Sequence, residues 1–299
     1  MDRKIGMRLS PSIGNEGIEA VAEWASGVGI DVIDVPYYNQ EIKSVLEIAG
    51  LEVGSIDGIG AVGQTNLLSS DEKIRSEAVS ALKNQITEVA ELGGKVIFMC
   101  LVPDDLNMSR KDAFEIWRKS FPSIVEHAEN HDVYIALEGW PGPSPQNPTL
   151  GCTPEMLRAM FKVIPSKHFG INYDPSHLVR LGIDYLRFLD EFKDRINYCH
   201  GKDTQVLQKE LYESGVISST FDSKYLFSEG SWRYTIPGKG DVDWAEVAVR
   251  LEKTGYQGPV SIELEDHYYW GSLEAERKGI MEAKEHLEAH FKNKAIVGE

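Results

Sequence analysis

The sequence predicts a closed (β/α)8 TIM barrel, and three observations indicate this fold class. Short apolar runs of strand length alternate with longer segments of helical periodicity along the chain, and eight such pairs can be distinguished. Alternation of this kind favours a parallel sheet, and eight units favour a sheet that closes on itself. The 299 residues show no linker or change in composition, so we expect one barrel domain over residues 1–299.

The first half of the chain contains four strand–helix pairs. Apolar side chains recur at helical spacing in the first predicted helix, as Ile13, Ile18, Val21 and Trp24 show. A glycine-rich segment, 57–68, separates the third strand from the third helix. The expected strands are 5–9, 31–35, 51–56 and 95–102, and the expected helices are 12–28, 40–49, 70–92 and 109–130.

The second half contains four more pairs, and two segments interrupt their rhythm. The expected strands are 133–137, 169–173, 196–199 and 259–262, and the expected helices are 153–164, 183–192, 243–253 and 273–290. A proline-rich run, W-P-G-P-S-P-Q-N-P, excludes regular helix and inner strand after the fifth strand. A long irregular segment, 206–232, follows the seventh strand. Both insertions are therefore expected at the C-terminal face of the barrel, where barrel enzymes carry their chemistry.

Charge and composition restrict the partners and the compartment. The formal net charge is −16, which repels phosphate backbones and anionic membranes, so we expect neither a nucleic-acid nor a membrane partner. No run approaches the roughly 18 apolar residues of a membrane helix, and the N-terminus lacks the apolar core of a signal peptide. Three scattered cysteines do not suggest a disulfide framework. We expect a cytoplasmic protein, and a homo-oligomer remains open.

Four consecutive strands end in side chains that can bind a metal ion. Glu138 ends the fifth strand, Asp174 the sixth, His200 the seventh and Glu263 the eighth. One imidazole and three carboxylates form a hard ligand set that suits Mn²⁺ best, with Mg²⁺, Co²⁺ and Zn²⁺ as alternatives. Such a set leaves coordination positions open for a substrate that has two adjacent oxygens.

Each of these residues also has a simpler interpretation. A glutamate at a strand end is most often a solvated loop residue, Asp174 could cap a turn, and His200 could be a barrel histidine with satisfied hydrogen bonds. Glu265 is a rival of Glu263 because strand alternation puts both on one face. We prefer Glu263 because it follows the apolar run directly. The coincidence on four strands favours a shared site.

The segments A-L-E-G-W, N-Y-D-P-S-H-L, C-H-G-K-D and V-S-I-E-L-E resemble the xylose isomerase-like TIM barrels. This sugar isomerase/epimerase superfamily includes D-tagatose and D-psicose 3-epimerases, inosose-processing enzymes, keto-glycoside epimerases and endonuclease IV, and the resemblance covers nearly the whole chain. It implies that Glu138, Asp174, His200 and Glu263 are the metal ligands. It also implies that His177, three residues after the aspartate, contacts substrate.

A further segment, R-Y-T-I-P-G-K-G-D-V-D-W, is similar to the ketohexose 3-epimerases, which implies that Arg233 holds a substrate oxygen. The chain departs from that pattern because a long segment separates Arg233 from His200, which indicates a lid or a modified pocket. Lys202 and Asp203 are interpreted either as supports of the metal site, with the carboxylate fixing the tautomer of the imidazole, or as a surface ion pair. Lys202 is also a candidate for substrate contact. Trp140 could stack on a sugar face or simply pack.

These observations lead to one leading hypothesis and its rivals. The chain is expected to be a divalent-metal-dependent epimerase or isomerase of a ketose or keto-glycoside, with Glu138 and Glu263 moving a proton next to the carbonyl through an enediolate. The alternatives are a lyase or dehydratase on a keto-glycoside or inosose, and a barrel with a structural ion. An endonuclease IV-like repair enzyme is disfavoured by the negative charge and because the first histidine is His127.

Overall fold

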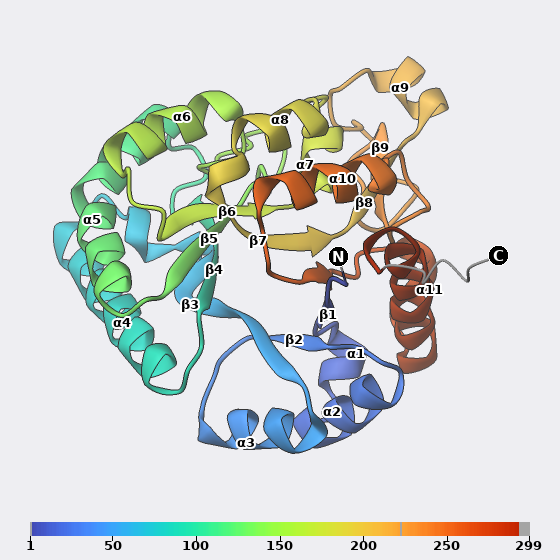
Figure 1. Ribbon diagram of the computed structural model, residues 1–299. Helices are drawn as coiled ribbons and strands as arrows, with labels where there is room; N and C mark the ends of the chain where they lie inside the picture. Colours follow the sequence, from blue (N-terminus) through green and yellow to red (C-terminus); the bar gives the residue numbers. More distant parts are fainter. Residues whose placement is uncertain (1, 222, 293–299) are drawn as a thin grey trace.

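The computed structural model describes residues 2–221 and 223–292, and it confirms the barrel (Figure 1). Eight parallel strands close in the order β1-β10-β7-β6-β5-β4-β3-β2, with Ile5 of β1 opposite Val260 of β10. The strands are β1 (Ile5–Arg8), β2 (Val32–Val35), β3 (Glu52–Thr65), β4 (Val96–Pro103), β5 (Tyr134–Glu138), β6 (Phe169–Tyr173), β7 (Ile196–Gly201) and β10 (Val260–Ile262).

Helices surround the barrel, and most begin at a side chain that caps the first turn. Asn39, Asp71, Ser109, Thr153 and Asp243 each accept a hydrogen bond from a backbone N–H of the turn that follows. The α-helices are α1 (Pro11–Gly14), α2 (Ile18–Gly27), α3 (Gln40–Ala49), α4 (Glu72–Glu91), α5 (Arg110–Asn130), α6 (Pro154–Val163), α7 (Pro175–Arg180), α8 (Tyr185–Glu191), α9 (Gln208–Ser214), α10 (Trp244–Thr254) and α11 (Leu273–Phe291). None of the helices in the described residues is long and apolar enough to cross a membrane.

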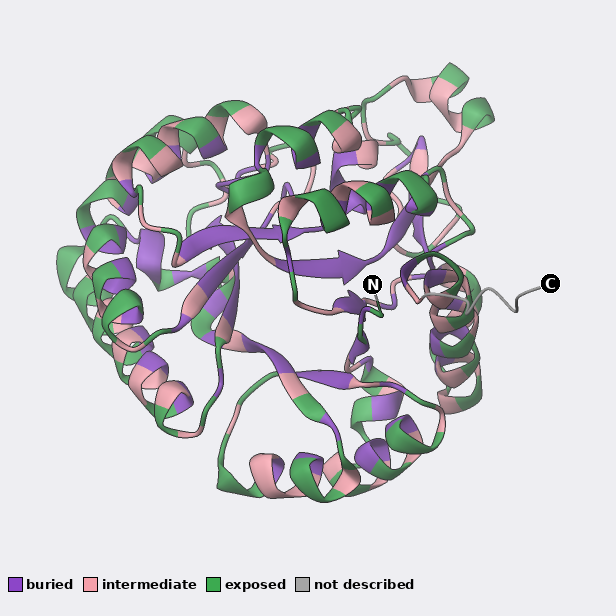
Figure 2. Ribbon diagram, in the orientation of Figure 1, coloured by how far each residue is buried: buried purple, intermediate pink, exposed green. Residues whose placement is uncertain are grey.

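The core lies between the barrel and the inner faces of the helices. Figure 2 shows most strands of the barrel buried, with exposed stretches on β3, while the helices alternate buried and exposed faces. Trp117 and Phe121 of α5 stack on each other and pack against Phe169 of β6. This packing attaches α5 to the first residue of β6.

Two elements differ from the sequence prediction for local reasons. The predicted helix 12–28 is two helices, because Gly17 has a φ of 84° and breaks the run between α1 and α2. The glycine-rich segment after Ile56 is part of β3, which continues to Thr65 beyond an irregularity between Asp57 and Val62. Because glycine has a low strand propensity, the glycine-rich sequence did not predict this extension of the strand.

Both insertions lie after the strands predicted for them. The proline-rich segment follows β5, and the segment after β7 forms an antiparallel pair, β8 (Asp203–Val206) and β9 (Trp232–Thr235). The stretch between β8 and β9 carries α9 and leads away from the barrel (Figure 1). Ser144 Oγ of the first insertion donates to Glu229 Oε2 of the second at 2.6 Å, so the two insertions contact each other.

Candidate metal centre and substrate cavity

Four strand ends bring their polar side chains to one place in the barrel mouth. Glu138 is the last residue of β5, Asp174 caps α7 directly after β6, His200 lies in β7, and Glu263 follows β10. His200 Nδ1 lies 3.4 Å from Glu138 Oε2 and 3.4 Å from Glu263 Oε2. Ligand atoms of Asp174, His200 and Glu263 all lie within 4.8 Å of one another.

The donor set fits a hard divalent cation. Glu138 Oε1, Asp174 Oδ2 and both ring nitrogens of His200 are buried and form no hydrogen bond within the described residues, and their nearest polar neighbours are charged side chains at 3.1–3.8 Å. Buried polar atoms are normally hydrogen-bonded, so a cluster of buried ligand atoms without hydrogen bonds fits a bound metal ion. Three carboxylates and one imidazole match the preference of Mn²⁺ and similar ions for oxygen and nitrogen donors.

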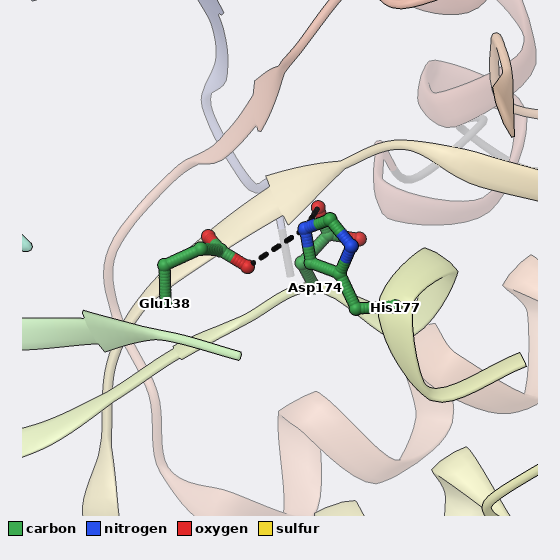
Figure 3. Close-up of side chains that lie close together, drawn as sticks. All are labelled: Glu138, Asp174 and His177. Atoms are coloured by element: carbon green, nitrogen blue, oxygen red, sulfur yellow. Dashed lines mark ion pairs between the residues drawn. The ribbon is translucent and has the colours of Figure 1, made fainter. Parts of the chain in front are cut away.

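His177 projects from α7 into the same cluster. Its Nε2 lies 3.1 Å from Glu138 Oε1 and 3.4 Å from Asp174 Oδ2, and Figure 3 shows both carboxylates directed at the ring. Its Nδ1 is 2.6 Å from the hydroxyl of Tyr234 in β9. A residue of the second insertion therefore fixes the orientation of His177. Sequence reasoning missed Tyr234, although it follows Arg233 directly.

Lys202 is buried inside the cluster and is not part of a surface ion pair. Its Nζ lies 2.5 Å from Glu263 Oε2, 3.0 Å from Glu265 Oε2 and 3.3 Å from Asp174 Oδ2. An ammonium among three carboxylates offsets their mutual repulsion in the absence of an ion.

Asp203 does not contact the imidazole of His200, which corrects the expectation that it fixes the tautomer. Its carboxylate accepts hydrogen bonds from the backbone N–H groups of Gly238 and Val242 and from Trp244 Nε1 at 3.0–3.1 Å, and so holds the P-G-K-G loop.

Asp34 takes the position beside the imidazole. It lies in β2, and its Oδ2 is 3.8 Å from His200 Nε2. It accepts hydrogen bonds from the Ser55 backbone N–H at 2.8 Å, from Ser261 Oγ at 2.6 Å and from the hydroxyl of Tyr198. Its carboxylate is buried and its direction is fixed by three donors. In the sequence, the one sign that Asp34 has a functional role is the presence of an acidic residue within the apolar run V-I-D-V.

The charges of the cluster are tightly coupled. Burial lowers the pKa of His200, but the charge of Glu263 and the close contact with Glu138 outweigh burial and raise it to about 10. Burial raises the pKa of Glu138, and the close contact and charge of His177 then bring it well below its usual range. Burial likewise opposes ionisation of Glu263, and the charge of Lys202 lowers its pKa below the usual range. Both glutamates are therefore carboxylates at neutral pH, as ligands or bases must be.

A cavity of about 260 Å³ opens beside these groups. Trp140, His177 and Lys202, which the sequence proposed for substrate contact, line it. Its other lining residues include Arg8, Val62, Phe98, Glu138, Glu263 and Glu265.

Arg233 does not belong to the described residues that line this cavity. Its Nη1 lies 3.3 Å from Asp266 Oδ1, its Nε donates to Gln205 Oε1 at 2.9 Å, and its guanidinium lies over the rings of Tyr225 and Tyr268. These contacts attach the second insertion to the segment after β10. Substrate binding by Arg233 stays a prediction that these contacts do not support.

Comparison with known proteins gives the same fold and a mixed set of activities. A family model described as xylose isomerase-like TIM barrel matches residues 8–290. An uncharacterized protein of Bacillus subtilis is 32% identical over 172 residues, which are 56% of this chain and 50% of the relative. An inosose dehydratase of Lacticaseibacillus casei is 28% identical over 113 residues, 38% of this chain and 36% of the relative. An uncharacterized protein of Methanocaldococcus jannaschii is 25% identical, with 60% of its length covered, so the chain spans at most three fifths of these relatives.

Solved structures match over almost the whole chain. Mannonate dehydratase of Streptococcus suis serotype 2 superposes with a TM-score of 0.71 at 17% identity, covering 97% of this chain and 95% of that one. A 3-keto-D-glucoside 4-epimerase of E. coli superposes with a TM-score of 0.66 at 18% identity, covering 95% of this chain and 99% of that one. A D-tagatose 3-epimerase-like protein superposes with a TM-score of 0.66 at 21% identity, covering 96% of this chain and 97% of that one. At these identities the likeness shows the fold alone.

Proposed function

Because this chain belongs to the xylose isomerase-like TIM-barrel family, we propose that it is a divalent-metal-dependent carbohydrate enzyme that moves a proton at a carbon next to a carbonyl. The reaction we favour is epimerisation or isomerisation of a ketose or keto-glycoside. The observation that supports the proposal is the convergence of Glu138 and Glu263 on His200, in a cluster whose buried ligand atoms have no hydrogen bond within the described residues and which lies beside a cavity.

Glu138, Asp174, His200 and Glu263 would hold the ion, which we take to be Mn²⁺, with Mg²⁺, Co²⁺ or Zn²⁺ as alternatives. A bound divalent ion supplies a Lewis acid that polarises a carbonyl and makes the neighbouring C–H more acidic. Asp34 lies 3.8 Å from His200 Nε2, and its charge would favour a proton on that nitrogen while Nδ1 faces the carboxylates. In this role Asp34 is a positioning residue.

In this proposal the two glutamates act on opposite faces of a substrate carbon. In the barrel order, β5 and β10 lie on either side of the pair β6 and β7, so Glu138 and Glu263 approach the cavity from different sides. One carboxylate removes a proton to give an enediolate, and the other returns a proton to the opposite face, which inverts the centre. Return of the proton to the neighbouring carbon gives isomerisation.

The cavity also contains groups that suit an elimination. The Lys202 ammonium and the His177 ring both line it, and either can donate a proton to a departing hydroxyl next to the carbanion. Inosose dehydratases are among the sequence relatives. A dehydratase acting on an inosose or keto-glycoside is therefore the second candidate, and it shares the first proton-abstraction step.

Deuterium exchange from D₂O into ketoses and 3-keto-glycosides, followed by NMR on Mn²⁺-loaded protein, tests the proposal. We expect exchange at a carbon next to the carbonyl in the wild type, and a loss of at least about 10²-fold in Glu263→Gln and in Glu138→Gln. Glu52→Gln is the matched control, because Glu52 begins β3 at the opposite end of the barrel. Full exchange in Glu263→Gln would refute its assignment as a base.

A further inference from the structure

The cations that face the cavity are already paired with carboxylates. Lys202 Nζ contacts Asp174, Glu263 and Glu265 within 3.3 Å. Arg8 Nη2 lies 2.8 Å from Asp57, and its Nε is 3.5 Å from Glu263 Oε1. Neither side chain presents an uncompensated positive charge to an incoming molecule.

The next cations along the mouth are paired as well. Arg180 forms an ion pair with Glu229 and lies over the ring of Trp232. Arg233 is paired with Asp266. Neither of these arginines is among the described residues that line the cavity, so they do not provide an anchor for an anionic substrate.

The balance of charge in and directly below the cavity is negative. Three cationic side chains, Arg8, Lys202 and His200, stand against six carboxylates, and a divalent ion at the site would not reverse the sign. The carboxylates are Asp34, Asp57, Glu138, Asp174, Glu263 and Glu265. A carboxylate or phosphate group on a substrate is negatively charged, and it would enter a low-dielectric site that is also negatively charged.

Glu265 differs from the other carboxylates that line the cavity in having no part in the proposed ligand set or in the Arg8 contacts. Its hydrogen bond within the described residues is the one that Lys202 donates at 3.0 Å, and it lines the cavity. It is therefore placed to compensate the one ammonium that could otherwise receive a substrate anion.

We propose that Glu265, by neutralising Lys202, makes this cavity selective for an uncharged keto-polyol and against sugar acids and sugar phosphates. The inference rests on the proposed function for the carbonyl and the ion, and it holds whether the reaction ends as epimerisation or elimination. It separates this chain from enzymes that use the same fold on an acid such as mannonate.

The size and walls of the cavity agree with such a ligand. A volume of about 260 Å³ lies just below the roughly 300–1,000 Å³ of pockets that hold drug-sized ligands, which favours a single sugar or cyclitol ring. Phe98, Val62 and Trp140 offer apolar surface to the C–H faces of such a ring. The carboxylates, His177 and Lys202 offer hydrogen-bond partners to its hydroxyls.

Binding calorimetry on Mn²⁺-loaded protein tests the inference without requiring turnover. The probes are neutral rings and chains (D-tagatose, D-psicose and a keto-inositol) and anions of similar size (D-mannonate and D-fructose 6-phosphate). We expect the wild type to bind a neutral probe more tightly than either anion. Glu265→Gln should shift the ratio of affinities toward D-mannonate by on the order of tenfold, the effect of removing one negative charge from the cavity wall.

Two further variants complete the test. Lys202→Met removes the cation and leaves Glu265 charged, so discrimination against D-mannonate should widen, which keeps the inference testable if Glu265→Gln does not fold. Glu52→Gln removes one negative charge at the far end of the barrel and should leave the ratio unchanged.

Tighter binding of an anion than of every neutral probe by the wild type would overturn the inference, as would failure of all neutral probes to bind. So would an unchanged ratio in folded Glu265→Gln. Selective binding of a neutral probe without any ion-dependent deuterium exchange would instead uphold the selectivity and count against the proposed proton transfer.

Discussion

Replacing Asp34 with asparagine should weaken metal binding although Asp34 is not a proposed ligand. The carboxylate lies 3.8 Å from His200 Nε2, on the side of the ring away from Glu138 and Glu263. When a metal ion displaces the proton on Nδ1, this carboxylate would favour the tautomer that keeps its proton on Nε2 and leaves Nδ1 free to bind the ion. Asparagine keeps the shape but removes the charge that makes this preference strong.

The expected loss follows from the distance. Two full charges 3.8 Å apart interact by about 4 kcal/mol at an effective dielectric constant of about 20. A neutral imidazole N–H carries only part of a charge, so we expect a loss of about 1.4–2.7 kcal/mol, which is a 10–100-fold weaker Kd for Mn²⁺. Isothermal titration calorimetry on the ion-free protein measures this directly.

The control is Ser261→Ala, which removes one hydrogen bond to Asp34 and keeps the carboxylate. It should change the Kd much less than Asp34→Asn does. If folded Asp34→Asn binds Mn²⁺ within twofold of the wild type, the imidazole does not depend on this carboxylate and our account of its orientation is wrong.

Two further predictions concern stability. Glu276 accepts hydrogen bonds from Ser10 and Ser12 at the start of α1, which bring its pKa below the usual 4.5 against the effect of burial. Because its folded-state pKa is depressed, the stabilisation is present above about pH 4.5 and is lost as the pH falls through the folded pKa. Glu276→Gln should therefore reduce the free energy of unfolding, measured with urea, by about 2–3 kcal/mol at pH 7 and by less near pH 4. Equal reductions at the two pH values would contradict this. Lys202→Met leaves the charges of Asp174 and its neighbours uncompensated, so the free energy of unfolding of the ion-free variant should fall by about 3–5 kcal/mol. Adding Mn²⁺ should then raise the Tm of this variant by more than it raises the Tm of the wild type. An equal shift of Tm in both proteins would count against Lys202 as the compensating charge.

Much of the site could be predicted because strand ends are visible in a sequence. The end of each apolar run marks where a side chain reaches the barrel mouth, and Glu138, Asp174, His200 and Glu263 all lie at such ends. Closure of the barrel then brings together residues more than a hundred positions apart.

The residues contributed by the second insertion could not be predicted in the same way. Side chains alternate between the two faces of a strand, so a shift of one residue decides which side chain faces the site. Motif similarity drew attention to Arg233, but in β9 it is Tyr234 that contacts His177, while Arg233 pairs with Asp266. Which side chain of β9 faces the site depends on how β9 pairs with β8, and the irregular sequence between the two strands does not predict this pairing.

Asp34 shows a second limit. An isolated acidic residue in an apolar strand is a signal, but its partners come from β3, β7 and the last barrel strand, β10. β3 pairs directly with β2, but only closure of the barrel brings β7 and β10 near it. The sequence therefore offered Asp203 as the carboxylate beside the imidazole, although its actual partners are backbone N–H groups and an indole.

The central claim is that one divalent ion at this site enables proton exchange next to a carbonyl. The most direct measurement combines Mn²⁺ titration of the ion-free protein with deuterium exchange into neutral keto sugars before and after loading. We predict one ion per chain and exchange that appears only with that ion. Exchange of equal rate without the ion, or the absence of both binding and exchange, would contradict the account.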